Sequence, residues 1–382
     1  MFGEGSAADE GKMSKVEFCT LGMFILDDID FEGSRPSVKN VLGGAASFAV
    51  IGARLAAGKE YSRSVSWIVD VGSDFPPEVL DAIKAWDTDC VIRKDSSRLT
   101  TRAWNGYGPN EKRGNVPGSQ RCASEMITKD SLPVLDPEAT IRATYAVGLP
   151  SALKNIPYGL FLVPLYNHNM CTLEEQQKFL EACREVDIVS PNDLELGMMF
   201  GQSAWNEESS LGKEIVDKIL ESGVGPRGEG HLVIRAGKEG SYTYSRGLRI
   251  WLPAYHQPTA SGESPVVDPT GAGNSFLGAL AQGMVSEGRD AAKAVASVLS
   301  ESAVWRKAAA VCGKHQSIPL ALILATVAAS FVVEQIGVPH RSTSAEGKEH
   351  WNGTEFTERV RLYTQGLYRT LEESPQKHLQ IN

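Results

Sequence analysis

Residues 267–276 read Val-Asp-Pro-Thr-Gly-Ala-Gly-Asn-Ser-Phe, and this stretch decides the fold of the 382-residue chain. Val266-Val267 is expected to end a strand, Thr270–Gly273 to form a turn without bulky side chains, and Phe276–Met284 to begin a helix. Glycines let a backbone approach a ligand closely, and the amides of a helix N-terminus attract an anion. On its own, the pattern also fits an ordinary strand–turn–helix connection.

The rest of the chain alternates short apolar runs with helical patterns. We expect strands at Val16–Phe24, Val65–Val71, Cys90–Ile92, Thr144–Val147, Leu160–Leu165, Val186–Ser190 and His231–Ala236, and helices at Leu42–Leu55, Pro77–Ala85, Leu173–Arg184 and Gly212–Ser222. Such alternation predicts an α/β fold whose mostly parallel sheet carries helices on both faces. A ligand site is then expected outside the carboxyl ends of the strands.

The residues around the Gly-Ala-Gly turn make the pattern specific. Asp268, Thr270 through Gly273, Ser275 and Phe276 match Asp-Thr-x-Gly-Ala-Gly-Asp-x-Phe, the C-terminal signature of the ribokinase-like or PfkB carbohydrate kinase family. From about residue 16 to 340 the chain resembles this family, as a divergent, fungal-type member. The resemblance implies a ribokinase-like fold with a mostly parallel central sheet, helices on both faces and a small lid.

The resemblance also implies an organisation of the chain. A disordered tail is expected at 1–15, and a single kinase domain at 16–340 with a lid or loop at about 105–131. A C-terminal tail with a short helix is expected at 341–382. The helix is placed at Phe356–Leu371, on the surface. The polar and Ala-rich segment 297–316 is additional to the family pattern, and its sequence fits either a helix or a loop.

Site residues follow from the same resemblance. Asp27, Gly43 and Gly44 would bind the acceptor, and Asn192 and Glu195 would serve the magnesium and phosphate site. Gly237, Gly240, Asp268 and Thr270 would border the nucleotide, while Gly271, Ala272, Gly273 and Asn274 occupy the catalytic positions. The implied cofactors are ATP and Mg²⁺, and the family also admits a monovalent cation.

Two of these assignments have structural alternatives. Asn192 and Glu195 stand three apart after a strand, which suits a water-mediated magnesium site but equally a helix capping box. Asp27 has Asp28 and Asp30 as neighbours, so it also fits a solvated carboxylate at a strand end.

Besides the smaller change of threonine to Pro269, two departures from the family pattern bear on the chemistry. Asn274 stands where the family has the aspartate that takes the proton of the acceptor hydroxyl, and a carboxamide has no basic lone pair for that role. Phe48 stands where the asparagine of the Gly-Gly motif is expected, and a phenyl ring cannot hydrogen-bond a sugar. The acceptor is therefore expected to be less polar than ribose or to bind differently.

The amino-acid composition limits which classes of binding partner are expected. With 38 basic and 47 acidic residues, the net charge is −9, which disfavours nucleic acid and anionic membranes. The six cysteines form no CxxC pair, as is typical of reduced thiols in a cytoplasmic protein. The apolar run Ile318–Val333 has 16 residues, too few to span a bilayer. We expect a small-molecule acceptor, no nucleic acid or membrane partner, and a monomer or homodimer.

Three functions are compatible with these features. The first is an ATP-dependent phosphotransferase that phosphorylates an alcohol of a sugar, nucleoside or related molecule. The second is a catalytically weak or silent ligand-binding or regulatory protein on the same fold, because Asn274 replaces the aspartate. The third, a nicotinamide-dependent oxidoreductase, would use Gly43-Gly44, but the Gly-x-Gly-x-x-Gly spacing is missing.

Overall fold

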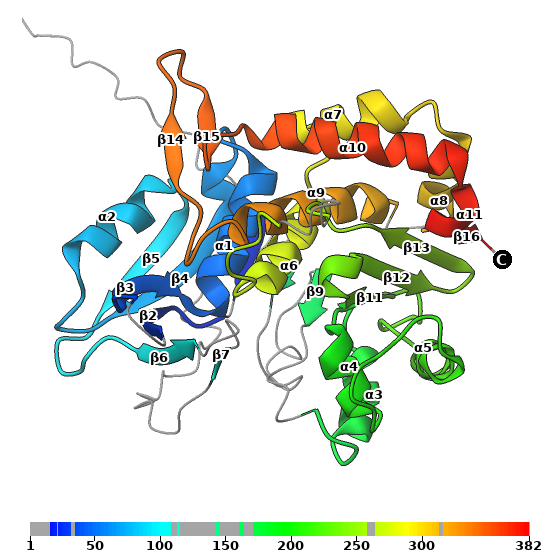
Figure 1. Ribbon diagram of the computed structural model, residues 1–382, viewed down its shortest axis with the longest axis horizontal. Coiled ribbons are helices and arrows are strands. Elements are labelled where there is room, and N and C mark those ends of the chain that lie inside the picture. The colour runs from blue at the N-terminus through cyan, green and yellow to red at the C-terminus, as the bar shows by residue number, and fades with distance from the viewer. Residues whose placement is uncertain are drawn as a thin grey trace, which may run out of the picture.

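The computed structural model describes residues 16–20, 22–31, 35–107, 113–114, 143–145, 160–163, 171–257, 264–312 and 316–381. A ten-stranded sheet with helices on both faces forms the body of the protein, and a four-stranded sheet lies beside it (Figure 1). The expected α/β fold with a mostly parallel sheet is confirmed.

Most of the large sheet is parallel because its strands are short apolar runs joined by helical crossovers. In spatial order, the parallel strands are β5 (Asp89–Lys94), β4 (Val65–Val71), β1 (Phe18–Thr20), β8 (Ala143–Tyr145), β9 (Leu160–Val163), β10 (Ile188–Val189) and β11 (His231–Arg235). Parallel neighbours end on the same edge, so the chain segments that follow β10 and β11 lie next to each other.

The other end of the sheet is antiparallel. It consists of β12 (Ser241–Ser245), β13 (Leu248–Leu252) and β16 (Leu379–Ile381). The edge strand β16 comes from the last residues of the chain and pairs with β13. The sequence pattern shows no strand there, because three residues are too few for a visible alternation.

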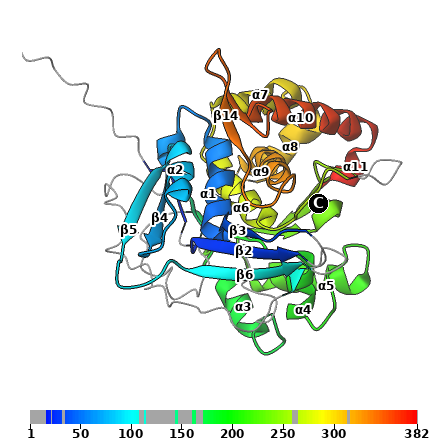
Figure 2. The same ribbon diagram turned by 60° about the vertical axis from the view of Figure 1, so that its left-hand side comes forward.

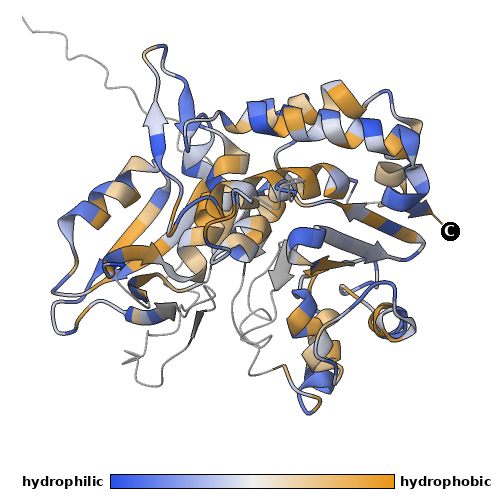
Figure 3. Cartoon of the chain, viewed as in Figure 1, coloured by the Kyte–Doolittle hydropathy of each residue, from blue (hydrophilic) through white to orange (hydrophobic). Residues whose placement is uncertain are grey.

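Helices cover the two faces of the sheet unequally. One face carries α1 (Gly44–Ala57), α6 (Ala272–Gly283) and α9 (Ile318–Val332), and the other carries α3 (Gln176–Cys183) and α5 (Ser210–Ser222). Strand β11 supplies Val233 to the first core, and Leu232 and Ile234 to the second. The most apolar ribbons are the central helices α1, α6 and α9 (Figure 3).

Helix α9 is the apolar run whose length argued against a membrane span. It is buried along almost its whole length in the main core. Within the described ranges, no helix combines the length and apolarity needed to cross a bilayer.

The small sheet has the order β3-β2-β6-β7 and runs across the body below α1 (Figure 2). Its strands are β3 (Val38–Gly43), β2 (Ile25–Phe31), β6 (Arg102–Tyr107) and β7 (Arg113–Gly114). The expected single strand at Val16–Phe24 is wrong, because β1 ends at Thr20 and a second strand contains Asp27. Part of the expected loop at 105–131 is strand; the segments 108–112 and 115–131 lie outside the described residues, as does the expected tail at 1–15.

The C-terminal residues are packed into the body rather than lying on it. A hairpin of β14 (Arg341–Thr343) and β15 (Glu349–Trp351) leads to α10 (Phe356–Glu373), which lies along α7 (Asp290–Leu299) and α9 (Figure 1). Helix α10 is longer than the expected short surface helix, and its Val360 and Leu367 are buried in the main core. A short helix α11 (Pro375–His378) then leads into β16. The expectation of a surface helix missed these contacts because they join distant segments.

The sequence of segment 297–316 fitted either a helix or a loop. The structure has helix α8 (Ala303–Val311) there. Its Ala308 is fully buried, and Cys312 just after the helix is nearly so. The described cysteines are free thiols, as expected; Cys122 lies outside the described residues. Burial raises the pKa of Cys19 and of Cys312 to about 12, so both act as packing residues at neutral pH.

Candidate active site

Asp27 and the Gly43-Gly44 motif meet at the junction of β2, β3 and α1. Asp27 is buried, and a methyl group at Gly43 would stand 2.0 Å from its Oδ2. Gly44 has a φ of 85°, which favours glycine where the chain turns into the helix. The two predicted acceptor-binding elements are therefore in contact.

The neighbouring aspartates have other roles. Asp28 Oδ1 accepts a hydrogen bond from the Asn40 amide at 3.1 Å and lies 3.5 Å from the Arg102 guanidinium. Asp30 accepts a hydrogen bond from the Trp104 indole. Both hold the small sheet together, which leaves Asp27 as the carboxylate at the glycine motif.

Helices α1 and α6 cross at a contact between backbones. A Cβ at Gly52 would stand 1.9 Å from the Ser275 carbonyl oxygen, and one at Gly278 would stand 1.8 Å from that of Ala49. One turn from this crossing, the Phe48 ring lies against Gly271, with ring carbons 2.3 Å from the position of a Cβ there. The aromatic departure from the family pattern thus forms a wall beside the Gly-Ala-Gly turn.

The signature stretch itself differs locally from its prediction. No strand forms at Val266-Val267, and α6 begins at Ala272, earlier than the expected Phe276. Gly271 precedes it with a φ of 82° and has no side chain to cap the helix. The Ala272 and Gly273 backbone therefore belongs to the first helical turn, and Asn274 follows directly in it. The Ala272 amide donates to the Pro269 carbonyl at 3.2 Å, and the amides that follow it in this turn are suited to an anionic ligand.

Asp268 and Thr270 hold the loop in front of the helix. Asp268 is 3% exposed, and its Oδ1 accepts the Thr270 amide at 2.9 Å. The amides of Val267 and Asp268 both donate to the Val333 carbonyl at the end of α9. These two hydrogen bonds hold the loop against the end of α9. Their acceptor, Val333, directly precedes Glu334 in the chain.

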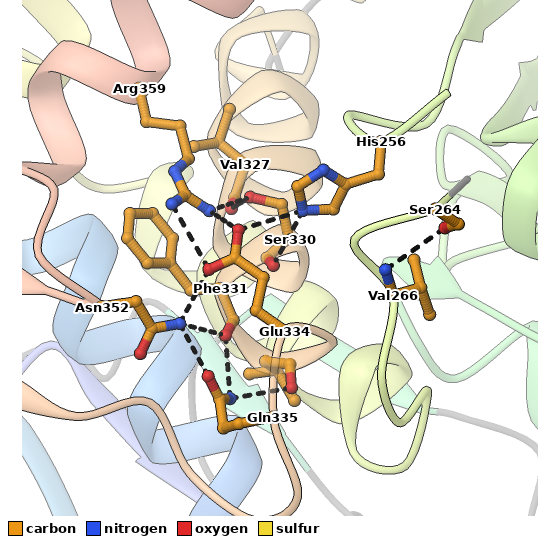
Figure 4. Close-up of polar contacts among 11 residues, drawn as sticks. His256, Ser264, Val266, Val327, Ser330, Phe331, Glu334, Gln335, Asn352 and Arg359 are labelled. Carbon is orange, nitrogen blue, oxygen red and sulfur yellow. Dashed lines mark hydrogen bonds and ion pairs between the residues drawn. The ribbon is translucent and has the colours of Figure 1, made fainter. Parts of the chain in front are cut away.

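Glu334, just after the end of α9, is the centre of a polar cluster (Figure 4). Its carboxylate accepts hydrogen bonds from Arg359 at 2.6 Å and from Asn352 at 2.8 Å, and lies 3.1 Å from His256 Nε2. Burial would raise the pKa of the Glu334 carboxyl, but the hydrogen bonds from His256, Arg359 and Asn352 outweigh it and lower the pKa to about 2. The cluster ties α10 and the hairpin to the loop that carries Asp268.

Asn192 and Glu195 form a helix capping box, one of the two roles that their spacing predicted. Asn192 Oδ1 accepts the Glu195 amide at 2.7 Å, and Glu195 Oε2 accepts the Asn192 amide at 2.8 Å, at the start of α4 (Asp193–Met199). The same Oε2 lies 3.3 Å from Nη2 of Arg235. The magnesium role stays a prediction, and any cation at Glu195 would have this guanidinium as a neighbour.

Arg235 is a further candidate site residue, to which the sequence alone assigned no role of its own. It ends β11, and its Nη1 lies 2.0 Å from the position of a Cβ at Gly273, in the first turn of α6. Its Nη2 donates to the Ser190 carbonyl at 3.0 Å, and its buried Nε has no hydrogen-bond partner in the described part of the chain. A charged residue at the end of the apolar run at 231–236 was the available signal, although the run alone could not show what it faces.

Gly237 and Gly240 shape the turn after β11. Gly237 has a φ of 52°, and no atom of the described residues lies within 4 Å of a Cβ placed there. Gly240 has a φ of 91°, and a Cβ on it would meet the Leu252 carbonyl at 2.0 Å. The turn is thus tight at Gly240 and open at Gly237, next to Arg235.

Arg235 brings Glu195 and Gly273 together near the carboxyl ends of β10 and β11, whereas Asp27 and Gly43 meet at the small sheet. A phosphate chain suits the region at Gly273, because the uncapped α6 turn and the Arg235 side chain both favour negative charge. Among the described residues, no group of three or more His, Cys, Asp or Glu side chains could hold a metal ion. A magnesium ion at Glu195 would therefore depend on oxygens from a bound nucleotide.

These features define a protein with the ribokinase-like fold, in which the candidate site residues lie on a small sheet and at the carboxyl edge of a large one. A family model for the pfkB family carbohydrate kinases matches residues 165–342. The chain is 30% identical to the uncharacterized protein C16C9.01c of Schizosaccharomyces pombe, over 92% of this chain and 94% of that protein. It is also 30% identical to protein MAK32 of Saccharomyces cerevisiae, over 90% and 91% respectively.

Among solved structures, a ribokinase from Giardia lamblia superimposes with a TM-score of 0.56 at 16% identity, covering 94% of this chain and 100% of that one. At this identity the likeness shows the fold alone. Together with the matches in sequence, it places the chain in a family: the protein belongs to the pfkB, or ribokinase-like, carbohydrate kinase family.

Proposed function

We propose that this protein is an ATP-dependent phosphotransferase that transfers the γ-phosphate to an alcohol group of a small molecule. The observation that carries the proposal is the path of contacts through α1. Asp27 lies against Gly43 before the helix, and Phe48 within it lies against Gly271. An acceptor held by Asp27 would thus be directed toward the first turn of α6.

The acceptor would be held by one carboxylate and one aromatic wall. Asp27 can accept hydrogen bonds from hydroxyl groups. Phe48 is 3% exposed and presents a ring rather than an amide. We therefore expect a hydroxyl-bearing molecule with an apolar or flat part, within the range of sugars, nucleosides and related compounds.

Catalysis would rest on alignment and charge stabilisation. The backbone of Gly271, Ala272 and Gly273 would face the phosphoryl group, which needs positioned donors more than covalent chemistry. Asn274 can orient a hydroxyl but cannot take its proton, and a positioned base typically contributes 10²–10⁴-fold. The expected reaction is therefore slow.

The family implies that transfer uses Mg²⁺, which would neutralise phosphate charge during the reaction. Asn192 and Glu195 are the residues that would lie on its protein side, while Gly237, Gly240, Asp268 and Thr270 would border the nucleotide. A cytoplasmic protein acting on a small molecule, as monomer or homodimer, fits this function.

Asp27→Asn is expected to lower kcat/KM by about 10- to 100-fold, because an ionised acceptor contributes about 1.5–3 kcal/mol. The measurement is ADP release by the purified protein over a panel of sugars and nucleosides. Asp30→Asn, on the same strand but bonded to Trp104, is the matched control and should change kcat/KM less than about threefold. Equal activity of Asp27→Asn and the native chain would remove Asp27 from the acceptor site.

A second candidate is a silent ligand-binding or regulatory protein on the same fold. It is favoured by Asn274 in the first turn of α6 and by the Phe48 ring against Gly271. Such a protein would bind a nucleotide without turnover. Restoring a base at position 274 discriminates the two candidates, since a silenced kinase would gain turnover.

A further inference from the structure

We infer that Arg235 supplies the positive charge that holds the nucleotide phosphates, so that this protein binds ATP without needing Mg²⁺. The inference rests on the proposed nucleotide site and concerns the binding step rather than the transfer step.

The positively charged Arg235 side chain and the N-terminus of α6 meet at Gly273. The α6 N-terminus carries the partial positive charge of the helix dipole, and Nη1 of Arg235 lies against the same glycine. A guanidinium and a helix N-terminus repel each other, and Glu195 beside Nη2 offsets part of this repulsion. This arrangement in a largely buried region is therefore one that a bound phosphate would stabilise.

The guanidinium is held in place for this role. Nη2 donates to the Ser190 carbonyl and lies 3.3 Å from Glu195, and the Arg235 side chain is only 15% exposed. Nη2 faces these protein acceptors, whereas Nη1 is directed at Gly273 and the buried Nε lacks a partner among the described residues. Nη1 is therefore the nitrogen that would donate a charge-assisted hydrogen bond to a phosphate oxygen.

The charge balance favours the arginine over a metal. Asn274 is neutral where the family pattern has a carboxylate, so one negative charge that would draw a cation is missing. Glu195 is already engaged by Arg235, and a second cation there would meet like charge. The phosphate charge would thus be balanced by the protein itself.

The test is calorimetric titration with ATP, in excess EDTA and again in excess Mg²⁺. We expect the two Kd values of the native chain to agree within about threefold. Arg235→Gln should weaken metal-free ATP binding by about 10- to 100-fold, the loss of one charge-assisted hydrogen bond. Arg235→Lys keeps the positive charge but loses the planar guanidinium. Its metal-free Kd for ATP should therefore lie between those of the native chain and Arg235→Gln.

Two controls separate phosphate contact from damage to the fold. Arg246→Gln makes the same change of charge at an exposed position, beyond the end of β12 that is remote from Arg235, and should leave ATP binding unchanged. Adenosine, which lacks phosphates, should bind native and Arg235→Gln protein equally. Binding of ATP by the native chain only with Mg²⁺, or equal metal-free affinity of Arg235→Gln, overturns this inference and leaves the kinase proposal standing. No ATP binding under either condition overturns both.

Discussion

Replacing Gly52 by alanine is expected to destabilise the folded chain by roughly 3 kcal/mol, at the upper end for overpacking. The new methyl group would stand 1.9 Å from the Ser275 carbonyl oxygen, an atom of backbone that no rotamer change can move. Relief requires α1 and α6 to separate, and protein interiors are too densely packed to yield locally. The same separation would displace Phe48 and Gly271, so ligand binding should weaken as well.

Urea denaturation followed by circular dichroism measures this effect. The matched control is Gly366→Ala in α10, where a Cβ meets nothing within 4 Å. That change should raise stability by about 0.5–1 kcal/mol, because alanine is the better helix former. A Gly52→Ala protein as stable as the native chain would show that the two helices do not cross at backbone contact.

Glu334→Gln is expected to lower the free energy of unfolding by about 3 kcal/mol at neutral pH. The ordinary carboxyl pKa of 4.5 falls to about 2 in the folded protein, which measures how strongly the surroundings favour the charged form. Among the described residues, the substitution would leave Arg359, whose side chain is 8% exposed, with Ser330 Oγ as its side-chain hydrogen-bond acceptor. Breaking a buried pair in this way strands a charge.

The loss should depend on pH with a definite sign. Since the folded pKa of Glu334 lies below its unfolded value, its contribution is present above about pH 4.5 and disappears as the pH falls towards 2. Native and Glu334→Gln proteins should therefore differ most near pH 7 and converge in acid. Glu358→Gln, which breaks an exposed pair with Arg361 on α10, should cost less than about 1 kcal/mol. A constant difference from pH 7 to pH 3 would contradict the assigned role.

Local patterns were enough to predict much of the fold. Helix α2 and strand β4 have their expected bounds, Pro77–Ala85 and Val65–Val71, since each is a single pattern closed by clear boundaries. The buried helix α9 was recognised because its apolar run is too short for a bilayer. The candidate site at Gly271–Gly273 was predicted because glycines before a helix start form a recognisable signature.

What the sequence could not provide were contacts between distant segments. Arg235 and Gly273 are far apart in the chain, and only the fold brings the guanidinium to the helix. Likewise, Glu334 accepts hydrogen bonds from Arg359 and Asn352. Both lie in the C-terminal segment that the sequence pattern predicted to be a tail. Asn192 and Glu195 were ambiguous for a different reason, because capping and metal binding require the same residue types at the same spacing.

The proposed reaction is phosphoryl transfer from ATP to an alcohol, slowed by Asn274. The direct measurement is ATP-dependent phosphorylation of a sugar and nucleoside panel by the native chain and by Asn274→Asp, each checked for ATP binding. We expect slow acceptor-dependent ADP release by the native chain and a rate about 10²-fold or more higher for Asn274→Asp. Turnover only in Asn274→Asp would identify a silenced kinase. ATP binding without ADP release by either protein, with every acceptor, would contradict the claim.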